Sequence, residues 1–294
     1  MKIASITIYC NERFRLEAWK SYYDEYKDEL YRHIIVNNGN PAETAVLRST
    51  FPDSVVLESP TPNMMASYNL ALRHILDNYP EVDAIAQIVN DIRLSAKGFS
   101  VLYDCLSTHP DAAMASPVLL RRDSRTIDCF GCDIRPRTLD FVHLDAARTL
   151  DEVPVEDRIV TGLPAGIILA SRVAYERFGF QDETIQMYAD EVDMGIRAAR
   201  LGYCFVATSR ASAWHQHVNP GGRAQRSERA GFLMGRNPVY IAGKYGRKVF
   251  PVFLHRVYRG LDEIRSAVMH GKGRDSRRFG WCMIRGAFAG LHMS

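Results

Sequence analysis

The chain has 294 residues, of which 47% are hydrophobic and 24% charged, and this is the composition of an ordinary globular protein. Its length allows one large α/β domain or two smaller ones. No run of about 18 or more uncharged apolar residues occurs, which argues against a membrane-spanning helix. The N-terminal stretch MKIASITIYC is a poor signal peptide, so we expect a cytoplasmic protein.

The net charge of +3 hides an asymmetry along the chain. Residues 223–294 carry a net charge of +11, whereas residues 1–222 carry −8. A basic C-terminal segment on an acidic body indicates contact with something anionic: a membrane surface, a phosphate-bearing substrate or nucleic acid.

The first 110 residues alternate strand-like and helix-like segments. Apolar runs predict strands over residues 2–9, 31–36, 54–60 and 82–89, and amphipathic runs predict helices over 12–30, 64–79 and 98–109. This alternation is typical of βαβ units and a largely parallel sheet. Ligands of such sheets bind beyond the carboxyl ends of the strands. The loops that follow the predicted strands, at residues 10–13, 37–40, 58–63 and 90–93, are therefore expected near one site.

The pattern weakens from about residue 120 to 160, where polar and turn-forming residues predict a hairpin with a mobile loop. Cys129 and Cys132 lie here without a second pair to complete a zinc site, which favours reduced, structural thiols. Regular elements return over residues 163–180, in an acidic helix and in a strand over 203–208. Basic, aromatic-rich segments that favour helices follow.

Two polar groups follow apolar strand-like runs and suit a metal ion. Asp91 is either part of an Asn-Asp turn or a hard oxygen ligand for Mg²⁺ or Mn²⁺, which would hold a diphosphate. His215 and His217 face the same side of an extended chain, so they are either structural or further metal ligands.

A nucleotide would have to be held without a glycine cradle. No GxGxxG follows a strand and no GxxxxGK[ST] occurs, so dinucleotide-type binding and a P-loop both lack support. Asn37 and Asn38 in VNNGN either cap the next helix or contact a base or ribose.

The segment MYADEVDMGIRAARLGY opens a helix with three carboxylates. Asp193 and Arg197 have the spacing of a favourable i, i+4 ion pair, and any carboxylate near a helix N-terminus is stabilised by the macrodipole. Glu191 is the acidic residue that local structure explains least, since no cation shares its face. Asp190 stays ambiguous.

Placed in chain order, these motifs resemble the family 2 glycosyltransferases with the GT-A fold, particularly bacterial rhamnosyl- and galactofuranosyltransferase-like members. VNDIRL is similar to their Asp-x-Asp motif, and the stretch from AGIILAS to ARLGY is similar to their Gly-Phe-Asp-Glu segment and the acidic pair that opens a helix. ASAWH and GRNPVYIAGKY resemble the segments that follow. The resemblance covers roughly residues 3–245.

The resemblance implies an α/β protein of the GT-A type, with a mixed, mostly parallel central sheet flanked by helices. The catalytic domain would span residues 1–222, with a nucleotide-binding half over about 1–95 and an acceptor half over about 96–222. A basic helical region over residues 223–294 would pack on it.

It also implies metal-dependent, inverting transfer of a sugar from a nucleotide-diphosphate donor, UDP- or dTDP-linked, to a hydroxyl of a glycan or lipid-linked acceptor. Such a transfer suits bacterial cell-surface polysaccharide synthesis. We expect the protein to be cytoplasmic and peripheral at the inner face of the membrane, which its basic C-terminal region would contact. Glu191 would be the catalytic base, with Asp190 orienting the acceptor or competing for that role. Asp91 and His215 would bind Mn²⁺ or Mg²⁺, with His217 ranked second among the histidines.

The residues that we expect to bind the nucleotide sugar are Asn11, Asn37, Asn38, Asn69, Asn90, Asp91 and Arg93. Gly166 and Asp190 are expected at the acceptor. The chain departs from the family at three points: Val89 replaces the first Asp of the metal motif, Asn37 replaces a nucleobase-contacting Asp, and the acidic pair reads Asp-Glu instead of Glu-Asp.

Two other functions are alternatives to this one. A nucleotidyltransferase of similar fold would need a glycine-rich N-terminal loop for triphosphate, which ITIYCNERFRLE lacks. A nucleic-acid-binding protein would use the basic tail, but the tail mixes its charges with Leu, Val and Ile, as in VFPVFLHRVYRGLDEIRSAV. That mixture fits an amphipathic surface helix better, so we expect no nucleic acid.

Overall fold

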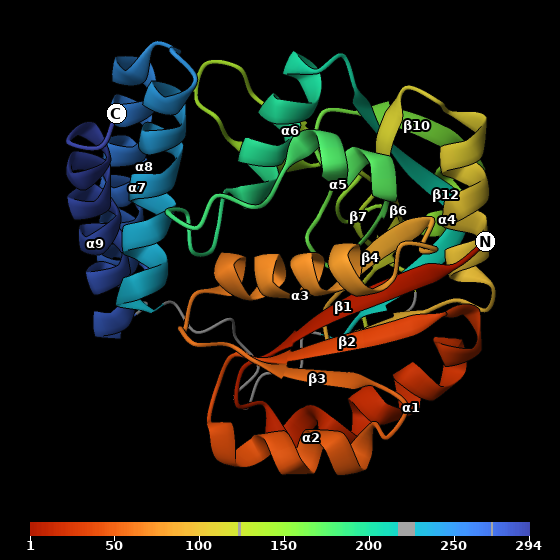
Figure 1. The fold of residues 1–294 in the computed structure, drawn as a ribbon. Helices are drawn as coiled ribbons and strands as arrows, with labels where there is room; N and C mark the ends of the chain where they lie inside the picture. Colours follow the sequence, from red (N-terminus) through yellow and green to blue (C-terminus); the bar gives the residue numbers. More distant parts are fainter. Residues whose placement is uncertain (123–124, 217–226, 272) are drawn as a thin grey trace. The chain divides into compact units, whose positions relative to one another are not determined.

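A computed structural model describes residues 1–122, 125–216, 227–271 and 273–294 (Figure 1). The strands are β1 (Ile3–Tyr9), β2 (Arg32–Asn37), β3 (Val55–Glu58), β4 (Ala84–Ile88), β5 (Ile92–Leu94), β6 (Ala112–Leu120), β7 (Ile127–Cys129), β8 (Cys132–Ile134), β9 (Phe141–His143), β10 (Asp157–Val160), β11 (Ile167–Ser171) and β12 (Cys204–His215). The helices are α1 (Leu16–Tyr26), α2 (Thr44–Thr50), α3 (Met64–Asn78), α4 (Gly98–Thr108), α5 (Arg172–Phe178), α6 (Asp190–Arg200), α7 (Glu228–Lys244), α8 (Val249–Met269) and α9 (Gly273–Leu291).

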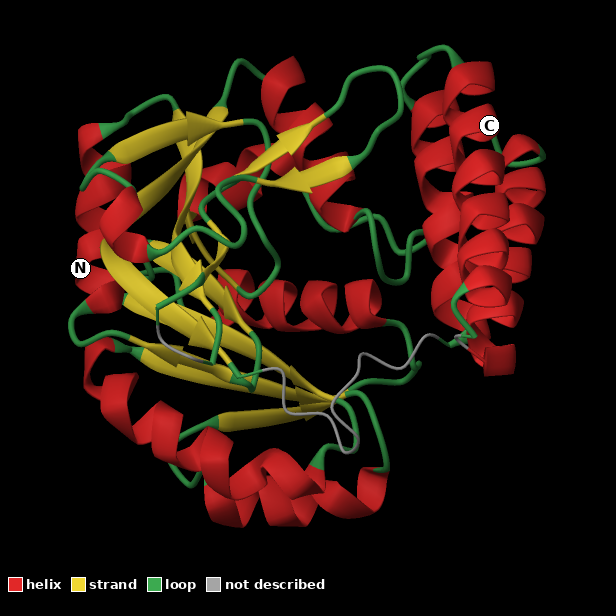
Figure 2. Cartoon of the chain, turned by 180° about the vertical axis from the view of Figure 1, so that it is seen from behind, coloured by secondary structure: helices red, strands yellow, loops and turns green. Residues whose placement is uncertain are grey.

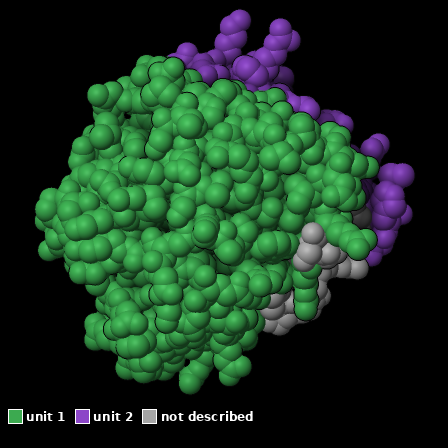
Figure 3. Space-filling view, turned by 90° about the vertical axis from the view of Figure 1, so that its right-hand side faces the viewer, with its two compact units in different colours: residues 1–133, 143–186, 194–218 green, residues 134–142, 187–193, 219–294 purple. Residues whose placement is uncertain are grey.

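The chain folds as two compact units, drawn in different colours in Figure 3. Unit 1 comprises residues 1–133, 143–186 and 194–218, and unit 2 comprises residues 134–142, 187–193 and 219–294. Two short segments from the middle of the chain therefore belong to the same unit as its C-terminal helices.

Unit 1 is built on one mixed sheet with the strand order β10-β12-β6-β11-β4-β1-β2-β3. Its β4-β1-β2-β3 half is parallel, as the alternation of strands and helices predicts, whereas β11 runs antiparallel to both β4 and β6. An α/β architecture with a helix-flanked sheet is thus confirmed.

The two faces of the parallel half are covered by different helices, because alternate residues of a strand point to opposite sides. On one face, Ile6 and Ile34 share a buried cluster with Leu72 of α3. On the other face, Trp19 of α1 stacks on Tyr9, with ring centroids 6.2 Å apart. Both faces are therefore buried, and the carboxyl ends of the strands are where polar side chains can emerge.

Strand β6 was not predicted, although all nine of its residues are buried. Its sequence AAMASPVLL contains Ala, Ser and Pro, which are poor strand formers. Pro117 pairs with Thr208 of β12 where the register shifts, so the missing N–H falls at an irregularity of the ladder. Burial between β11 and β12 overrides the local preference.

In unit 2, α7, α8 and α9 lie side by side (Figure 2). Glycines let their backbones approach closely: a Cβ atom on Gly235 would lie 2.0 Å from the carbonyl oxygen of Met283, and one on Gly286 would lie 2.0 Å from that of Phe232. Helices thus form in the C-terminal region as expected. Among the described residues, no helix is long and apolar enough to cross a bilayer.

Candidate functional site

The loops after β1, β2 and β4 meet in unit 1. The backbone N–H of Asn40 donates to Oδ1 of Asn11 (2.6 Å), which joins the first two loops. An ion pair between Arg15 and Asp91 joins the first loop to the third. The parallel arrangement of these strands therefore brings together the loops that the sequence places at one sheet edge.

Asp91 is the centre of this edge and is only 6% exposed. Its Oδ1 atom lies 3.3 Å from Nε2 of His215, and its Oδ2 atom lies 3.1 Å from Nη1 of Arg15. His215 ends β12 and pairs in register with Ile92 of β5, which follows Asp91 directly. The antiparallel pairing of β5 with β12 is thus what brings the histidine to the carboxylate.

A second layer of polar groups surrounds Arg15. Its Nη1 atom also lies 3.1 Å from Oε1 of Glu12 and donates to Oδ1 of Asn90 (3.4 Å). Asn90 in turn donates to the Glu12 carboxylate. Burial raises the pKa of the Glu12 carboxyl, while Asn90 and Arg15 lower it. Asn90 is thus placed beside Asp91, and Arg15 and Glu12 join them from the neighbouring loop.

The sequence analysis missed Arg15 and Glu12. The signal that could have found them is their place just after a buried strand, at the edge where ligands of such sheets bind.

Asn37 is 3% exposed, and its amide is used inside the VNNGN turn. Its Nδ2 atom donates to the carbonyl of Asn40 (2.9 Å) and to the Thr44 hydroxyl (3.0 Å), and its Oδ1 atom accepts from the N–H of Gly39 (3.0 Å). Asn37 therefore holds the turn together, whereas the helix that follows is capped by Asn40, whose Oδ1 atom accepts from the N–H of Ala42 (3.0 Å).

Asn38 is half-buried and Asn11 is exposed, so both side chains of these loops have accessible surface. Asn11 adopts the left-handed conformation with φ of 59°. Gly39 must be glycine because a Cβ atom there would lie 2.2 Å from Oδ1 of Asn11. The Nδ2 atom of Asn38 lies 3.8 Å from the Cys10 sulfur, and its buried Oδ1 atom accepts no hydrogen bond within the described part of the chain. Asn38 thus offers an acceptor to a ligand donor.

Asn69, which we expect to contact the nucleotide sugar, makes several hydrogen bonds within the protein. It is 1% exposed, donates to the carbonyl of Gln181 (2.9 Å) and to Oε1 of Glu183 (2.8 Å), and accepts from the N–H of Gln181 (2.7 Å). Because its amide joins α3 to the segment at 181–183, we do not carry Asn69 into the proposed site.

Arg93 lies on the surface of the protein, whereas Gly166 lies next to the loop that carries Asp91. Arg93 is exposed, and its Nε atom donates to Glu25 of α1 (2.7 Å) while its guanidinium lies over the Trp214 ring. The carbonyl of Gly166 accepts from the N–H of Val89 (3.0 Å), so this glycine lies next to the Asp91 loop. A Cβ atom there would lie 3.1 Å from Leu119, which is tight. The His217 position falls outside the described residues.

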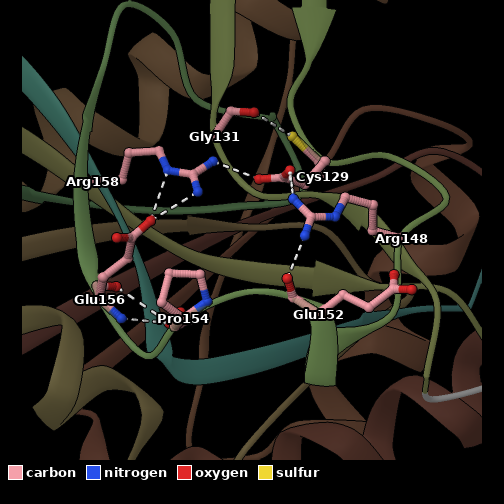
Figure 4. Close-up of polar contacts among 9 residues, drawn as sticks. Cys129, Gly131, Arg148, Glu152, Pro154, Glu156 and Arg158 are labelled. Atoms are coloured by element: carbon pink, nitrogen blue, oxygen red, sulfur yellow. Dashed lines mark hydrogen bonds and ion pairs between the residues drawn. The ribbon is translucent and has the colours of Figure 1, made fainter.

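The region from 120 to 160 contains short strands and a polar network (Figure 4). Arg158 donates to Glu156 (2.8 Å), and Arg148 donates to the carbonyl of Glu152 (Figure 4). The buried sulfurs of Cys129 and Cys132 lie 3.2 Å apart and are thiols that no disulfide joins. These contacts give the hairpin region more order than its composition predicts.

Two groups of three side chains in the described residues have the spacing of a metal site. One consists of Cys129, Cys132 and His143, and the other of Cys105, His109 and Asp157. In the second group both oxygens of the Asp157 carboxylate are bonded to Arg210, at 3.0 and 2.8 Å, so an arginine already compensates its charge.

The acidic pair Asp190 and Glu191 opens α6, and both side chains are half-buried. Burial raises the pKa of Asp190 to about 6, helped by the negative charge of Asp193. Burial and the adjacent Asp190 charge raise the pKa of Glu191 well above its usual value. A carboxylate with a raised pKa is a stronger proton acceptor, which is what a general base requires.

The backbone before this pair is strained. Gln186, Tyr188 and Ala189 have φ of 63° to 64°, a left-handed conformation that costs side-chain-bearing residues on the order of 1–3 kcal/mol each. Asn237 of α7 stabilises this segment: its Nδ2 atom donates to the carbonyls of Met187 and Tyr188, both at 2.8 Å.

Arg236 fixes the orientation of that amide, since its Nε atom donates to Oδ1 of Asn237 (2.9 Å). Asn237 is fully buried. The sequence analysis missed its role, although the Arg-Asn dipeptide was part of the motif GRNPVYIAGKY.

Asp193 is 1% exposed and is held within unit 2. Its Oδ1 atom lies 2.6 Å from Nζ of Lys244 and accepts from the Tyr245 hydroxyl (2.8 Å). Arg197, its expected partner, donates to the carbonyls of Phe178 and Phe180, both at 2.9 Å. The structure therefore shows Asp193 anchoring α6 to the end of α7.

Neither the models of protein families nor the curated proteins contain a match to this chain. Several solved structures are similar to it in fold. GalNAc-T7 with UDP, GalNAc and Mn²⁺ aligns over 96% of this chain with a TM-score of 0.62 and 10% identity, and this chain spans 55% of its length.

A mannosyltransferase from Pyrobaculum calidifontis in complex with GDP-Man and Mn²⁺ aligns over 99% of this chain and 87% of its own, with a TM-score of 0.61 and 13% identity. Residues 1–349 of TarS from S. aureus align over 82% of this chain and 65% of their own, with a TM-score of 0.52 and 12% identity. At these identities the likeness concerns the fold. The strand order, the helix-covered parallel half and these alignments agree: this chain has the GT-A fold of glycosyltransferases.

Proposed function

We propose that this protein is a metal-dependent glycosyltransferase that moves a sugar from a nucleotide-diphosphate donor to an acceptor hydroxyl with inversion at the anomeric carbon. The observation that carries the proposal is the approach of Asp91 to His215 (3.3 Å) at the carboxyl edge of a GT-A sheet. Two solved structures with this fold, GalNAc-T7 and the P. calidifontis mannosyltransferase, contain a nucleotide or nucleotide sugar with Mn²⁺.

The Asp91 and His215 pair fits a divalent cation. Two adjacent ligands of an octahedral ion lie roughly 3 Å apart when each bond is about 2.1 Å long. The distance of 3.3 Å between Oδ1 and Nε2 is close to that separation. Two protein ligands leave positions for diphosphate oxygens and water, which is how Mg²⁺ is commonly bound with phosphate substrates. When bound, Mn²⁺ or Mg²⁺ would neutralise charge on the leaving diphosphate.

Arg15 adds a fixed positive charge at the same edge. Its Nη1 atom lies 3.1 Å from Oδ2 of Asp91, so it holds the carboxylate in place and leaves Oδ1 directed at His215. We propose that Asn11, Asn38 and Asn90 contact the nucleotide from the surrounding loops, while Asn37 shapes the turn that carries Asn38. Arg93 and Gly166 stay predictions for the sugar and the acceptor.

Glu191 is our proposed general base, with Asp190 orienting the acceptor. Removing the proton of the attacking hydroxyl contributes about 10²–10⁴ in rate. The raised pKa values of the pair support this role, because they make the carboxylates stronger proton acceptors. We further propose a glycan or lipid-linked acceptor in cell-surface polysaccharide synthesis, a UDP- or dTDP-linked donor and a location at the inner face of a membrane.

The test is donor binding followed by turnover. Thermal unfolding is measured with UDP-, dTDP- and GDP-linked sugars, each with and without Mn²⁺. A ligand raises stability by RT ln(1 + [L]/Kd), so the right donor should raise the melting temperature only when metal is present. Hydrolysis of that donor is then followed with Mn²⁺ or Mg²⁺. Absence of metal-dependent stabilisation by every donor would contradict the proposal.

A further inference from the structure

The outer face of α8 is apolar. The exposed apolar side chains on this helix are Phe250, Pro251, Leu254, Tyr258, Leu261, Val268 and Met269. Their spacing places them on one face, which also carries Arg265. Val252, Gly260 and Ala267 point to the opposite, buried side. A helix exposed to water normally turns its polar side outward, so this arrangement is the reverse of the usual one.

This orientation of α8 is fixed by its inner side. Arg256 is 8% exposed, and its Nη2 atom donates to Oδ1 of Asp140 (2.9 Å) and to the carbonyl of Thr138 (2.8 Å). A Cβ atom on Gly260 would lie 2.7 Å from the carbonyl of Gly280, so α8 and α9 approach closely there. Turning the apolar face inward would break these buried contacts.

The outer face of α9 combines arginines with aromatic rings. The exposed side chains along this face are Arg274, Arg277, Arg278, Trp281, Arg285 and Phe288. Their spacing of three or four residues keeps them on one side of the helix. Arg278 is paired with Glu228 (3.3 Å).

The two faces form one surface. Phe253 of α8 stacks on Phe250, with ring centroids 6.5 Å apart, and meets Phe288 of α9 edge-on at 5.0 Å. This row of rings connects the apolar face of α8 to the arginine and tryptophan face of α9. We call the exposed residues of both faces the α8–α9 surface. Exposed apolar patches of this kind mark interaction sites.

We propose that the α8–α9 surface binds an anionic lipid bilayer. Its apolar side chains would enter the boundary between headgroups and acyl chains, and its arginines would contact lipid phosphates. Helices that lie in a membrane interface combine these two features, and Trp is favoured at that depth. The net charge of +11 over residues 223–294 complements an anionic surface.

A second copy of this chain fits the surface less well. Symmetric packing through the same face would bring two sets of arginines into one interface with little water, which like charges oppose. The membrane proposal does not rest on the proposed enzymatic activity, because vesicle binding is measured without donor or acceptor.

The experiment uses the full chain and two kinds of vesicle, one rich in phosphatidylglycerol and one of phosphatidylcholine alone. We expect sedimentation with the anionic vesicles, weakened by salt, and a blue shift of tryptophan emission as exposed Trp281 enters the interface. Trp19 is buried and should report little change.

Two double variants separate the apolar and the charged contributions. Leu254→Ser with Leu261→Ser should lower the partition coefficient on the order of tenfold or more. Arg277→Gln with Arg285→Gln should lower it about fivefold per arginine. All four residues are exposed, so the fold should survive, which circular dichroism checks.

Matched controls change the same residue types elsewhere. Val155→Ser with Ile159→Ser removes exposed apolar side chains of unit 1, and Arg48→Gln with Arg122→Gln removes exposed arginines there. Both controls should bind as the unmodified protein does. Failure of the unmodified protein to bind anionic vesicles would overturn the proposal. So would equal binding by all variants, or a stable dimer that only the leucine variant disrupts.

Discussion

The Oδ1 atom of Asp91 lies 3.3 Å from the Nε2 atom of His215. Asp91 directly precedes β5 and His215 ends β12, and the two residues, far apart in the sequence, meet because these strands pair.

Asp91→Asn should abolish metal-dependent donor binding, with turnover lowered by about 10²-fold or more, because an amide oxygen lacks the charge that a divalent cation requires. Thermal shift with nucleotide sugar and Mn²⁺ measures the binding. Asp104→Asn, which neutralises an exposed carboxylate on α4, serves as the control. If Mn²⁺ together with the nucleotide sugar still stabilises the Asp91→Asn variant, Asp91 is not a ligand of the metal.

Glu191→Gln should lower kcat by about 10²–10⁴-fold while donor binding persists, since the amide cannot accept the hydroxyl proton. Asp190→Asn should leave measurable turnover. The two variants therefore distinguish the candidate bases, and the opposite pattern would assign the role to Asp190.

The pH dependence of kcat should show an acid limb at higher pH than an ordinary carboxylate gives. The base must be unprotonated, so activity falls as pH drops through the apparent pKa of the pair, and the pKa values of both carboxyl groups are raised. Asp190→Asn removes the neighbouring negative charge that raises the pKa of Glu191, so the limb should move to lower pH. A limb that does not move would argue against coupled titration of these residues.

Glu191→Gln should also stabilise the protein at pH 8. The pKa values of both carboxyl groups are higher in the folded chain than in the unfolded chain, so the folded state holds protons more tightly and the charged pair destabilises it at high pH. We expect a gain on the order of 1 kcal/mol at pH 8, disappearing near pH 3, where the pair is largely protonated in both states. Urea unfolding at both pH values measures this difference in unfolding free energy. If Glu191→Gln is instead less stable than the unmodified protein at pH 8, the buried negative charge does not destabilise the fold.

Asn237→Ala should lower kcat while donor binding persists, because the carbonyls of Met187 and Tyr188 lose the donor that holds the strained backbone before Asp190. Ser227→Ala is the matched control: it removes the N-cap of the same helix at a cost of about 1 kcal/mol without touching that segment. If Asn237→Ala and Ser227→Ala lower kcat equally, the loss comes from general destabilisation of α7 and not from the segment that Asn237 holds.

Asn69→Ala should cost about 1–3 kcal/mol of unfolding free energy, because it leaves the buried backbone groups of Gln181 without partners. Donor affinity, measured well below the melting temperature, should not change. A loss of donor affinity without a loss of stability would show that Asn69 contacts the nucleotide sugar.

Much of the fold follows from local patterns. The apolar runs at residues 2–9 and 82–89 became β1 and β4, and the polar residues after them lie at the expected sheet edge. The resemblance to GT-A enzymes was confirmed at the level of the fold. Strand β6 escaped prediction because its Ala, Ser and Pro residues form a strand only when other strands bury them.

The side-chain partners were harder to predict. Asn37 ends β2 and Asn69 lies in α3, both at positions where a ligand contact is expected, but their amides bond to backbone groups of the protein itself. Arg15 was passed over because nothing near it in the sequence reveals that Asp91 lies 3.1 Å away. A sequence shows which polar groups exist, and the fold decides whether they meet each other.

Local sequence patterns are sufficient to predict the alternation of strands and helices, the sheet edge where polar loops gather, the acidic start of α6 and the basic character of the C-terminal region. These features depend on periodicity and composition over a few neighbouring residues. Three other features could be seen only in the folded chain: His215 reaches Asp91, Asn237 holds the strained segment before Asp190, and α8 turns its apolar side outward. Each of these depends on contacts between distant segments, whose burial and pairing energies exceed local preferences.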